Sequence, residues 1–100
     1  NNTIKLSQGE FVAISRLEAL YMHHPDIPQI YIYGTAERAF LLAIVVPSEE
    51  LMAQYVSEQT ETVKAAIRKA LLEVAEENQL NGWEVPRDFI VEILKSAEDV

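Results

Sequence analysis

Two groups of side chains in the sequence have the residue types needed for metal binding or acid–base chemistry. His23 and His24 are adjacent, and Glu73, Glu76 and Glu77 lie close together in a predicted helix. A zinc site needs such side chains at spacings that let them converge on one ion. Adjacent histidines at a helix end point in different directions, and no further ligand cluster has suitable spacing around them. We therefore interpret the histidines as a solvated helix end and the glutamates as a solvated face, and we predict no metal site.

Other arrangements that carry chemistry are missing from the sequence. It offers no nucleophile–base pair, no Gly-rich phosphate loop and no paired carboxylates at a defined spacing. The absence of cysteine excludes a disulfide framework, a thiol nucleophile and cysteine-ligated zinc. The net charge is −8 and the eight basic residues are spread singly, which argues against nucleic-acid binding. The residues alone predict an α+β domain and do not specify its function.

The length of 100 residues predicts one domain, residues 1–100. At this size, folding buries roughly two thirds of the surface of the chain, so a core forms without disulfides. No apolar run approaches the roughly 18 residues of a membrane span, and the first residues do not resemble a signal peptide. We expect a cytoplasmic protein with no membrane span.

Two apolar runs predict the centre of the fold. Residues 30–33 and 40–46 are short, rich in β-branched and aromatic residues, and bounded by Pro28, Gly34 and Pro47. Their length and composition predict two strands, joined as an antiparallel hairpin by a connection of about five residues. Neither run alternates apolar with polar residues, so we expect both faces of the sheet to be covered.

The remaining segments are predicted from turn and helix-cap signals. Residues 3–6 and 10–13 are expected to form a two-stranded hairpin that turns at Gly9. Ser15 and Glu18 have the spacing of a capping box, which predicts the start of the first helix. Ser48 and Thr60 are predicted to cap two further helices.

The last part of the chain completes the predicted order. Asn81 and Gly82 are expected to end the third helix. Residues 83–86 are predicted to be extended, and residues 89–94 to form the last strand. The resulting order is β-β-α-β-β-α-α-β. It predicts an α+β fold with an N-terminal two-stranded hairpin, a small mixed sheet and about three packed helices.

The segment from Ile4 to Val12, Ile-Lys-Leu-Ser-Gln-Gly-Glu-Phe-Val, resembles the start of the C-terminal subdomain of adenylate-forming enzymes. The resemblance is to the carboxylic acid reductases and the long-chain acyl-CoA synthetases. It continues through residues 17–19, 29–34 and 40–47 in the expected order. Pro-Arg-Asp-Phe at residues 86–89 favours the carboxylic acid reductases.

This resemblance implies a mobile C-terminal subdomain that swings between two poses against a large N-terminal subdomain. The enzyme would activate a carboxylic acid, of the fatty acid class in these groups, with ATP and magnesium to give an acyl-adenylate. It would then transfer the acyl group to a phosphopantetheine thiol on a carrier domain or on coenzyme A. Two alternatives remain open: a subdomain of a long-chain fatty acid–CoA ligase, and a non-catalytic module that binds an acyl-carrier partner.

The resemblance also implies roles for four residues. Asn1 falls on the hinge, where the family usually has Asp or Lys. Lys5 takes the place of a residue that enters the active site in the second pose. Gly9, with Gln8 beside it, matches the glycine that lets the pantetheine arm pass, although the turn also needs glycine at this point.

The adenylating lysine of the family lies in a Gly-Lys loop after the final strand. The sequence stops at Val100 without such a loop, and Lys95 has no preceding glycine. The resemblance therefore implies a fragment that lacks the catalytic-lysine loop and is inactive by itself.

Overall fold

A computed structural model of the chain describes residues 2–93. The helices and strands follow the predicted order, with one additional 3-10 helix, η1. Their bounds are β1 Thr3–Lys5, β2 Phe11–Ala13, α1 Ile14–Tyr21, β3 Gln29–Tyr33, β4 Leu42–Val46, α2 Glu49–Val56, α3 Thr60–Glu77, η1 Gly82–Glu84 and β5 Asp88–Val91. The α+β prediction is confirmed. The predicted hinge Asn1, the end of the predicted last strand at Leu94, and Lys95 lie outside the described residues.

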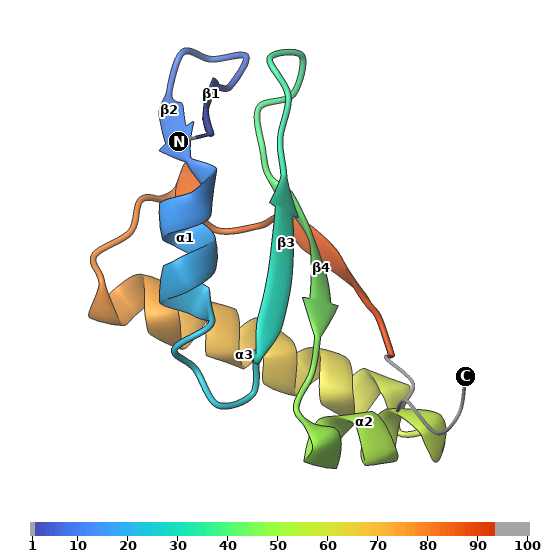
Figure 1. The fold of residues 1–100 in the computed structure, drawn as a ribbon. Helices are drawn as coiled ribbons and strands as arrows, with labels where there is room; N and C mark the ends of the chain where they lie inside the picture. The colour runs from blue at the N-terminus through green and yellow to red at the C-terminus, as the bar shows by residue number, and fades with distance from the viewer. Residues whose placement is uncertain (1, 94–100) are drawn as a thin grey trace.

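The strands form two sheets. β1 and β2 make an antiparallel hairpin, and β3, β4 and β5 make a three-stranded mixed sheet with β4 in the middle. β3 pairs antiparallel with β4, whereas β5 pairs parallel with it. Figure 1 shows α1 beside β3 and α3 running behind the sheet, with α2 at the end of the sheet that is farthest from the hairpin.

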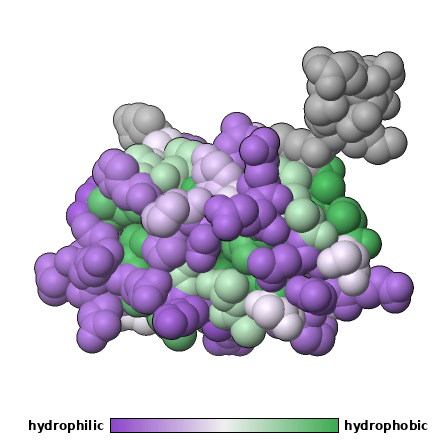
Figure 2. All heavy atoms as spheres, turned by 90° about the horizontal axis from the view of Figure 1, so that it is seen from below, coloured by the Kyte–Doolittle hydropathy of each residue, from purple (hydrophilic) through white to green (hydrophobic). Residues whose placement is uncertain are grey.

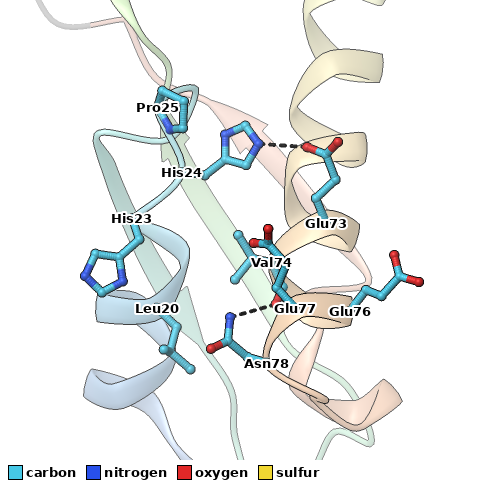
Figure 3. Close-up of a pocket in the computed structure, with 9 residues that line it drawn as sticks. All are labelled: Leu20, His23, His24, Pro25, Glu73, Val74, Glu76, Glu77 and Asn78. Carbon is cyan, nitrogen blue, oxygen red and sulfur yellow. Dashed lines mark hydrogen bonds and ion pairs between the residues drawn. The ribbon is translucent and has the colours of Figure 1, made fainter.

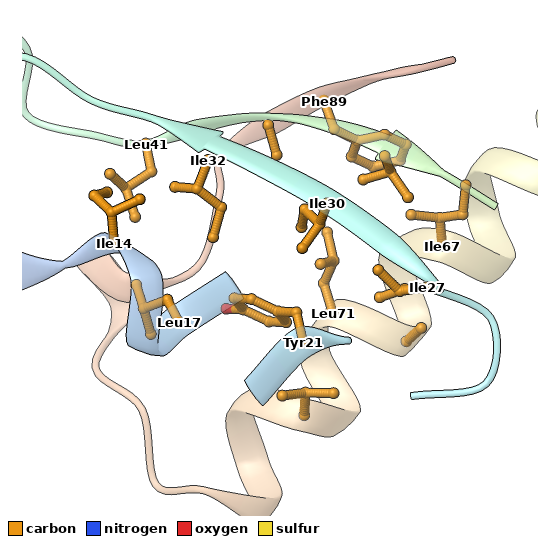
Figure 4. Close-up of a cluster of buried hydrophobic side chains, with 14 of the residues drawn as sticks. Ile14, Leu17, Tyr21, Ile27, Ile30, Ile32, Leu41, Ile67, Leu71 and Phe89 are labelled. Carbon is orange, nitrogen blue, oxygen red and sulfur yellow. The ribbon is translucent and has the colours of Figure 1, made fainter. Parts of the chain in front are cut away.

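The core lies between the three-stranded sheet and the helices α1 and α3. Ile30 and Ile32 of β3 face Leu17 and Tyr21 of α1, and Ile67 of α3 closes the cluster (Figure 4). The buried residues of α3 recur at helical spacing, which places them on one side of the helix as the sequence predicts. They are Val63, Ile67, Ala70, Leu71, Val74 and Ala75.

The other side of α3 carries charged side chains. Figure 2, which views the molecule from below, shows a mostly hydrophilic surface with smaller hydrophobic areas between the polar side chains. The division between a buried apolar side and a polar outward side is what holds the helices on the sheet.

The prediction that both faces of the sheet are covered is wrong for the described residues. Ile30 and Ile32 are buried, whereas Tyr31 and Tyr33, between and after them in β3, are exposed. Successive side chains of a strand point to opposite faces, and α1 and α3 pack on only one of them. The connection between β3 and β4 is also longer than predicted, since it comprises residues 34–41.

The predicted capping box at the first helix is also wrong. α1 begins at Ile14, so its N-cap residue is Ala13, two residues before the predicted N-cap Ser15, and Ala13 has no side-chain cap. Glu18 instead accepts a hydrogen bond from the backbone N–H of Ile32 at 2.8 Å, which ties α1 to strand β3. The predicted cap at Ser48 is confirmed, because its hydroxyl accepts from the N–H of Leu51 at 3.3 Å.

The boundaries of α3 differ from the prediction at both ends. Thr60 is the first residue of the helix and not its cap, and the helix ends at Glu77, before Asn81. Gln79 then adopts a φ of 51°, which turns the chain away. Residues 82–84 form η1 where an extended segment was predicted, because the Asn81 and Glu84 side chains cap this turn.

Candidate functional site

The β1–β2 hairpin contains three of the four residues to which the resemblance assigns a role: Lys5 at the end of β1, and Gln8 and Gly9 in the turn. Two backbone hydrogen bonds close the turn, from the N–H of Leu6 to the carbonyl of Glu10 at 2.8 Å and from the N–H of Gly9 to the carbonyl of Leu6 at 2.9 Å. Gly9 has a φ of +102°. A Cβ at Gly9 would meet no atom within 4 Å. The backbone conformation at this position therefore favours glycine, and the space above Gly9, where a Cβ would lie, is open.

The loop formed by residues 34–41 holds this turn in place. The N–H of Ser7 donates to the carbonyl of Arg38 at 2.9 Å, and Nε2 of Gln8 donates to the carbonyl of Ala39 at 3.1 Å. Figure 1 shows the hairpin and the β3–β4 loop next to each other at the top of the molecule. In this conformation the side chain of Gln8 therefore links the turn to the loop.

Gly34 allows the close approach of the hairpin and the loop. A Cβ at Gly34 would lie 2.5 Å from Cδ1 of Ile4 and 2.7 Å from Cδ2 of Leu41. Such distances are too short for two carbon atoms, so a side chain at this position would displace the ends of the Ile4 and Leu41 side chains that now fill the space. The turn that carries Gly9 is thus positioned by apolar packing as well as by hydrogen bonds.

Lys5 is the last residue of β1 and lies opposite Phe11 of β2. Its Nζ atom is 5.6 Å from the centroid of the Phe11 ring, and both side chains are exposed. Within residues 2–93, no carboxylate forms an ion pair with Lys5. The ammonium group is therefore held over an aromatic ring and accessible to an anion from outside the chain.

Asn2 is a structural anchor that the sequence analysis missed. Its Oδ1 accepts hydrogen bonds from the N–H of Ser15, at 3.0 Å, and from the Ser15 hydroxyl. Its carbonyl accepts from the N–H of Ile14 at 3.2 Å. Asn2 thus satisfies two of the free N–H groups at the start of α1, and it fixes the residue that follows the predicted hinge Asn1.

The Pro-Arg-Asp-Phe motif supports the same loop from the other side. The Arg87 guanidinium stacks on the ring of Phe40, 4.1 Å from its centroid, and the N–H of Arg87 donates to the carbonyl of Leu41 at 2.8 Å. Arg68 of α3 lies 4.9 Å from the centroid of Phe89 and donates to the carbonyl of Pro86 at 3.3 Å. These contacts show that the motif packs against the β3–β4 loop through Arg87 and against α3 through Phe89.

The two histidines lie at a separate hollow of about 530 Å³ between the end of α1 and α3 (Figure 3). His23 is exposed, as predicted, but the side chain of His24 is only 16% exposed and pairs with Glu73 at 2.8 Å. Nδ1 of His24 accepts from the N–H of Asp26 at 3.1 Å, so the proton of the neutral ring is on Nε2. His24 is therefore a structural link between α1 and α3, which corrects the prediction of a solvated helix end.

Among the glutamates that line this hollow, only Glu73 pairs with a histidine. In Figure 3 the Glu76 side chain points away from His24. In the part of the chain that the structure describes, no three His, Cys, Asp or Glu side chains are grouped to hold a metal ion.

Tyr21 is the titratable group in the core. Its hydroxyl donates to the carbonyl of Glu84 at 2.8 Å. Burial in the first place, and the negative charge of Glu84 in the second, raise the pKa of the Tyr21 phenol. The phenol stays neutral at physiological pH and joins α1 to η1, and it does not act as an acid or a base.

No helix within residues 2–93 combines the length and the apolar composition needed to cross a bilayer.

Curated relatives of the chain are enzymes that are much longer than it. It is 50% identical over 91 residues to the carboxylic acid reductase of Segniliparus rugosus, which covers 91% of this chain and 8% of that protein. It is 33% identical over 102 residues to long chain acyl-CoA synthetase 5 of Arabidopsis thaliana, covering 91% of this chain and 15% of the synthetase. No family model matches the chain. The chain therefore corresponds to a small part of these relatives.

Solved structures give the same result. The adenylation domain of a carboxylate reductase from Mycobacterium chelonae superposes with a TM-score of 0.87 at 45% identity, covering 96% of this chain and 15% of that one. The A-PCP didomain of the carboxylic acid reductase of Segniliparus rugosus, solved in complex with AMP, gives a TM-score of 0.84 at 48% identity, covering 96% and 13%. At this identity the likeness extends to the sequence as well as the fold.

Proposed function

Since the chain is homologous to a segment of carboxylic acid reductases and long-chain acyl-CoA synthetases, we propose that it is the mobile C-terminal subdomain of an adenylate-forming enzyme. The enzyme activates a carboxylic acid of the fatty acid class with ATP to an acyl-adenylate. It then transfers the acyl group to a phosphopantetheine thiol. ATP and a reduced thiol are both available in the cytoplasm, where we propose that the enzyme acts.

The observation that carries this proposal is the match to the A-PCP didomain at 48% identity over 96% of the chain. That structure contains AMP, the group that leaves when a thiol takes the acyl group from an acyl-adenylate. The segment matched there is 13% of the solved chain, so the nucleotide and acyl sites are proposed to lie mainly in the large N-terminal subdomain.

The hairpin is the part of the chain that we propose to act in the second half-reaction. Lys5 is accessible and unpaired with any described carboxylate, which suits a cation that meets an anionic group in only one pose. The open space above Gly9 suits the passage of a phosphopantetheine arm. Gln8 fixes the turn that presents both residues.

ATP and magnesium are proposed to be held mainly by the large subdomain. The chain contributes no grouped set of metal-binding side chains among its described residues. Magnesium would neutralise phosphate charge during adenylation. The part of this chain would be to orient Lys5 toward the reacting groups.

The proposal has two forms, which differ in the thiol that accepts the acyl group. The match to an A-PCP didomain favours the thiol of a carrier domain. The 33% identity to a plant long chain acyl-CoA synthetase keeps coenzyme A as the alternative acceptor. A non-catalytic module that binds a carrier partner is the third possibility, and it differs in that its parent would form no acyl-adenylate.

The test uses the full-length enzyme that contains this chain. ATP–pyrophosphate exchange reports adenylation, and thioester formation on the carrier or on coenzyme A reports transfer. We expect Lys5→Ala to reduce thioester formation by about a hundredfold, the effect of removing one electrostatic contact at a reacting group, with exchange little changed. Lys69→Ala, which removes an exposed lysine of α3, is the matched control and should change neither rate.

Two results would contradict the proposal. Equal loss of both half-reactions in Lys5→Ala would mean that the hairpin only stabilises the fold. Absence of ATP–pyrophosphate exchange in the full-length enzyme with every acid tried would contradict the proposed enzymatic function. The isolated 100-residue chain is expected to show no exchange, because it corresponds to 8% of the reductase that it resembles.

A further inference from the structure

Within residues 2–93, one face of the three-stranded sheet is not covered by a helix, and this face is apolar. Tyr31 and Tyr33 of β3, Leu42 and Ile44 of β4, and Ile90 of β5 point to the side opposite α1 and α3. We call these five residues the outer face. Tyr33 is 56% exposed and Ile90 is 62% exposed, while Ile44 at the centre is half-buried by its neighbours.

Strand register makes the outer face continuous. Tyr31 pairs with Ile44, and Ile44 pairs with Ile90, so one row crosses all three strands. Tyr33 and Leu42 pair in a second row that ends at Asp88. Directly paired side chains lie about 5 Å apart on the same side of a sheet. The two rows border a shallow hollow of about 350 Å³.

Charge is almost absent from these two rows. Asp88 stands at their edge, and its Oδ1 lies 3.7 Å from Nη2 of Arg68, which is on the opposite side of the strand. Five of six adjacent positions are thus apolar or phenolic. A continuous exposed patch of this kind is uncommon on a protein that works alone and marks a contact surface.

We propose that the outer face docks on the remainder of the adenylation domain, which rests on the function proposed above. In the solved relatives the matched segment is 13–15% of the chain, so a body several times larger is joined to it. The helices fill the other face of the sheet, which leaves the outer face for that body. The tyrosines suit a contact that opens and closes, because each has an apolar ring and a hydroxyl that tolerates water.

A second copy of this chain is a poorer occupant. Each copy has a net charge of −8, so pairing two outer faces would bring two strongly acidic molecules together. Docking within one polypeptide also needs no encounter between molecules, because the linked parts are held at a high effective concentration.

The test measures thiol labelling in the isolated chain and in the full-length enzyme. The chain contains no cysteine, so Ile90→Cys and Leu42→Cys each introduce one known thiol. Val56→Cys on α2 and Leu72→Cys on α3 are matched controls, since both replace exposed apolar residues outside the outer face. Mass spectrometry of the labelled peptide keeps other thiols of the full-length enzyme from interfering. Each enzyme is labelled with and without ATP and acid.

We expect Ile90→Cys and Leu42→Cys to label about tenfold more slowly in the full-length enzyme in at least one of these states, as for a face covered nine-tenths of the time. The two controls should label equally fast in both proteins. Equal rates at Ile90 and Leu42 in both proteins, or equal slowing at the controls, would overturn the proposal. Slowing that grows with the concentration of the isolated chain would identify a second copy as the occupant and also overturn it.

Failure of this proposal is distinguishable from failure of the proposed function. ATP–pyrophosphate exchange is measured separately on the unmodified full-length enzyme. If the enzyme is active and its outer face is labelled freely, only the docking proposal is wrong. If the enzyme is inactive and its outer face is protected, only the proposed enzymatic function is wrong.

Discussion

The side chain of Asn2 caps helix α1 through Ser15, with 3.0 Å between Asn2 Oδ1 and the backbone nitrogen of Ser15. The two residues are joined across the base of the β1–β2 hairpin. The contact satisfies a helix N–H group that the N-cap residue Ala13 leaves without a side-chain partner. It also links the hairpin to the first helix at Asn2, the residue that follows the predicted hinge Asn1.

Asn2→Ala should lower the free energy of unfolding by about 1 kcal/mol, the usual effect of removing a helix N-cap. Urea melts of the isolated chain measure this loss. Ser15→Ala is the matched variant, because it removes the hydroxyl donor and keeps the backbone hydrogen bond to Asn2. Its effect should be smaller. Equal stability of Asn2→Ala and the unmodified chain would show that solvent replaces the cap.

Substitutions at Gly9 should separate backbone strain from obstruction. Any side chain at a φ of +102° is strained, so Gly9→Ala and Gly9→Leu should both cost about 1–3 kcal/mol of stability. In the full-length enzyme, Gly9→Ala should retain thioester formation, whereas the larger Gly9→Leu should block it and leave pyrophosphate exchange intact. Gly82→Leu is the control, since its side chain would enter open space without a positive φ. Equal thioester formation in Gly9→Ala and Gly9→Leu would refute the passage of the pantetheine arm at this point.

Burial on the two faces of the sheet predicts different costs for the same substitution. Ile67 of α3 is 0% exposed, so Ile67→Ala should destabilise the isolated chain by about 2–5 kcal/mol. Ile90→Ala on the outer face should cost less than about 1 kcal/mol, because the side chain is already in contact with water. Denaturant melts of both variants provide the measurement. A similar large cost at the two positions would show that the outer face is covered within the isolated chain.

The raised pKa of the Tyr21 phenol predicts a loss of stability in alkali. In the unfolded chain the phenol ionises near pH 10. In the folded chain its pKa is higher, so its contribution is fully present below about pH 10 and declines as the pH rises beyond that value. Tyr21→Phe should reduce this decline.

The same variant should cost about 1 kcal/mol at neutral pH, since it removes the hydrogen bond to the carbonyl of Glu84. Melts between pH 7 and pH 11, roughly spanning the ionisation of a free phenol, test both effects. Tyr33→Phe is the control for the neutral-pH loss, because the Tyr33 side chain is exposed. An unchanged alkaline decline in Tyr21→Phe would assign the decline to other groups.

The sequence by itself determined the α-helices and strands, their order and the resemblance to adenylate-forming enzymes, but not the 3-10 helix η1. The apolar spacing in α3, the cap at Ser48 and the punctuation around β3 and β4 are local features, and local features depend on residues within a few positions of each other. The hairpin that carries Lys5, Gln8 and Gly9 was predicted for the same reason, although the roles of these residues remain proposals.

Only the tertiary structure decided which groups meet across long separations. Glu18 has the spacing of a capping residue, yet it binds the N–H of Ile32, and α1 takes its cap from Asn2. His24 reaches Glu73, which is 49 positions away. The covering of the sheet could not be predicted either, because apolar strands look alike in sequence whether a helix of the same chain or a separate body packs on them. Burial depends on what the whole molecule places against a face, and that information is not local to the strand.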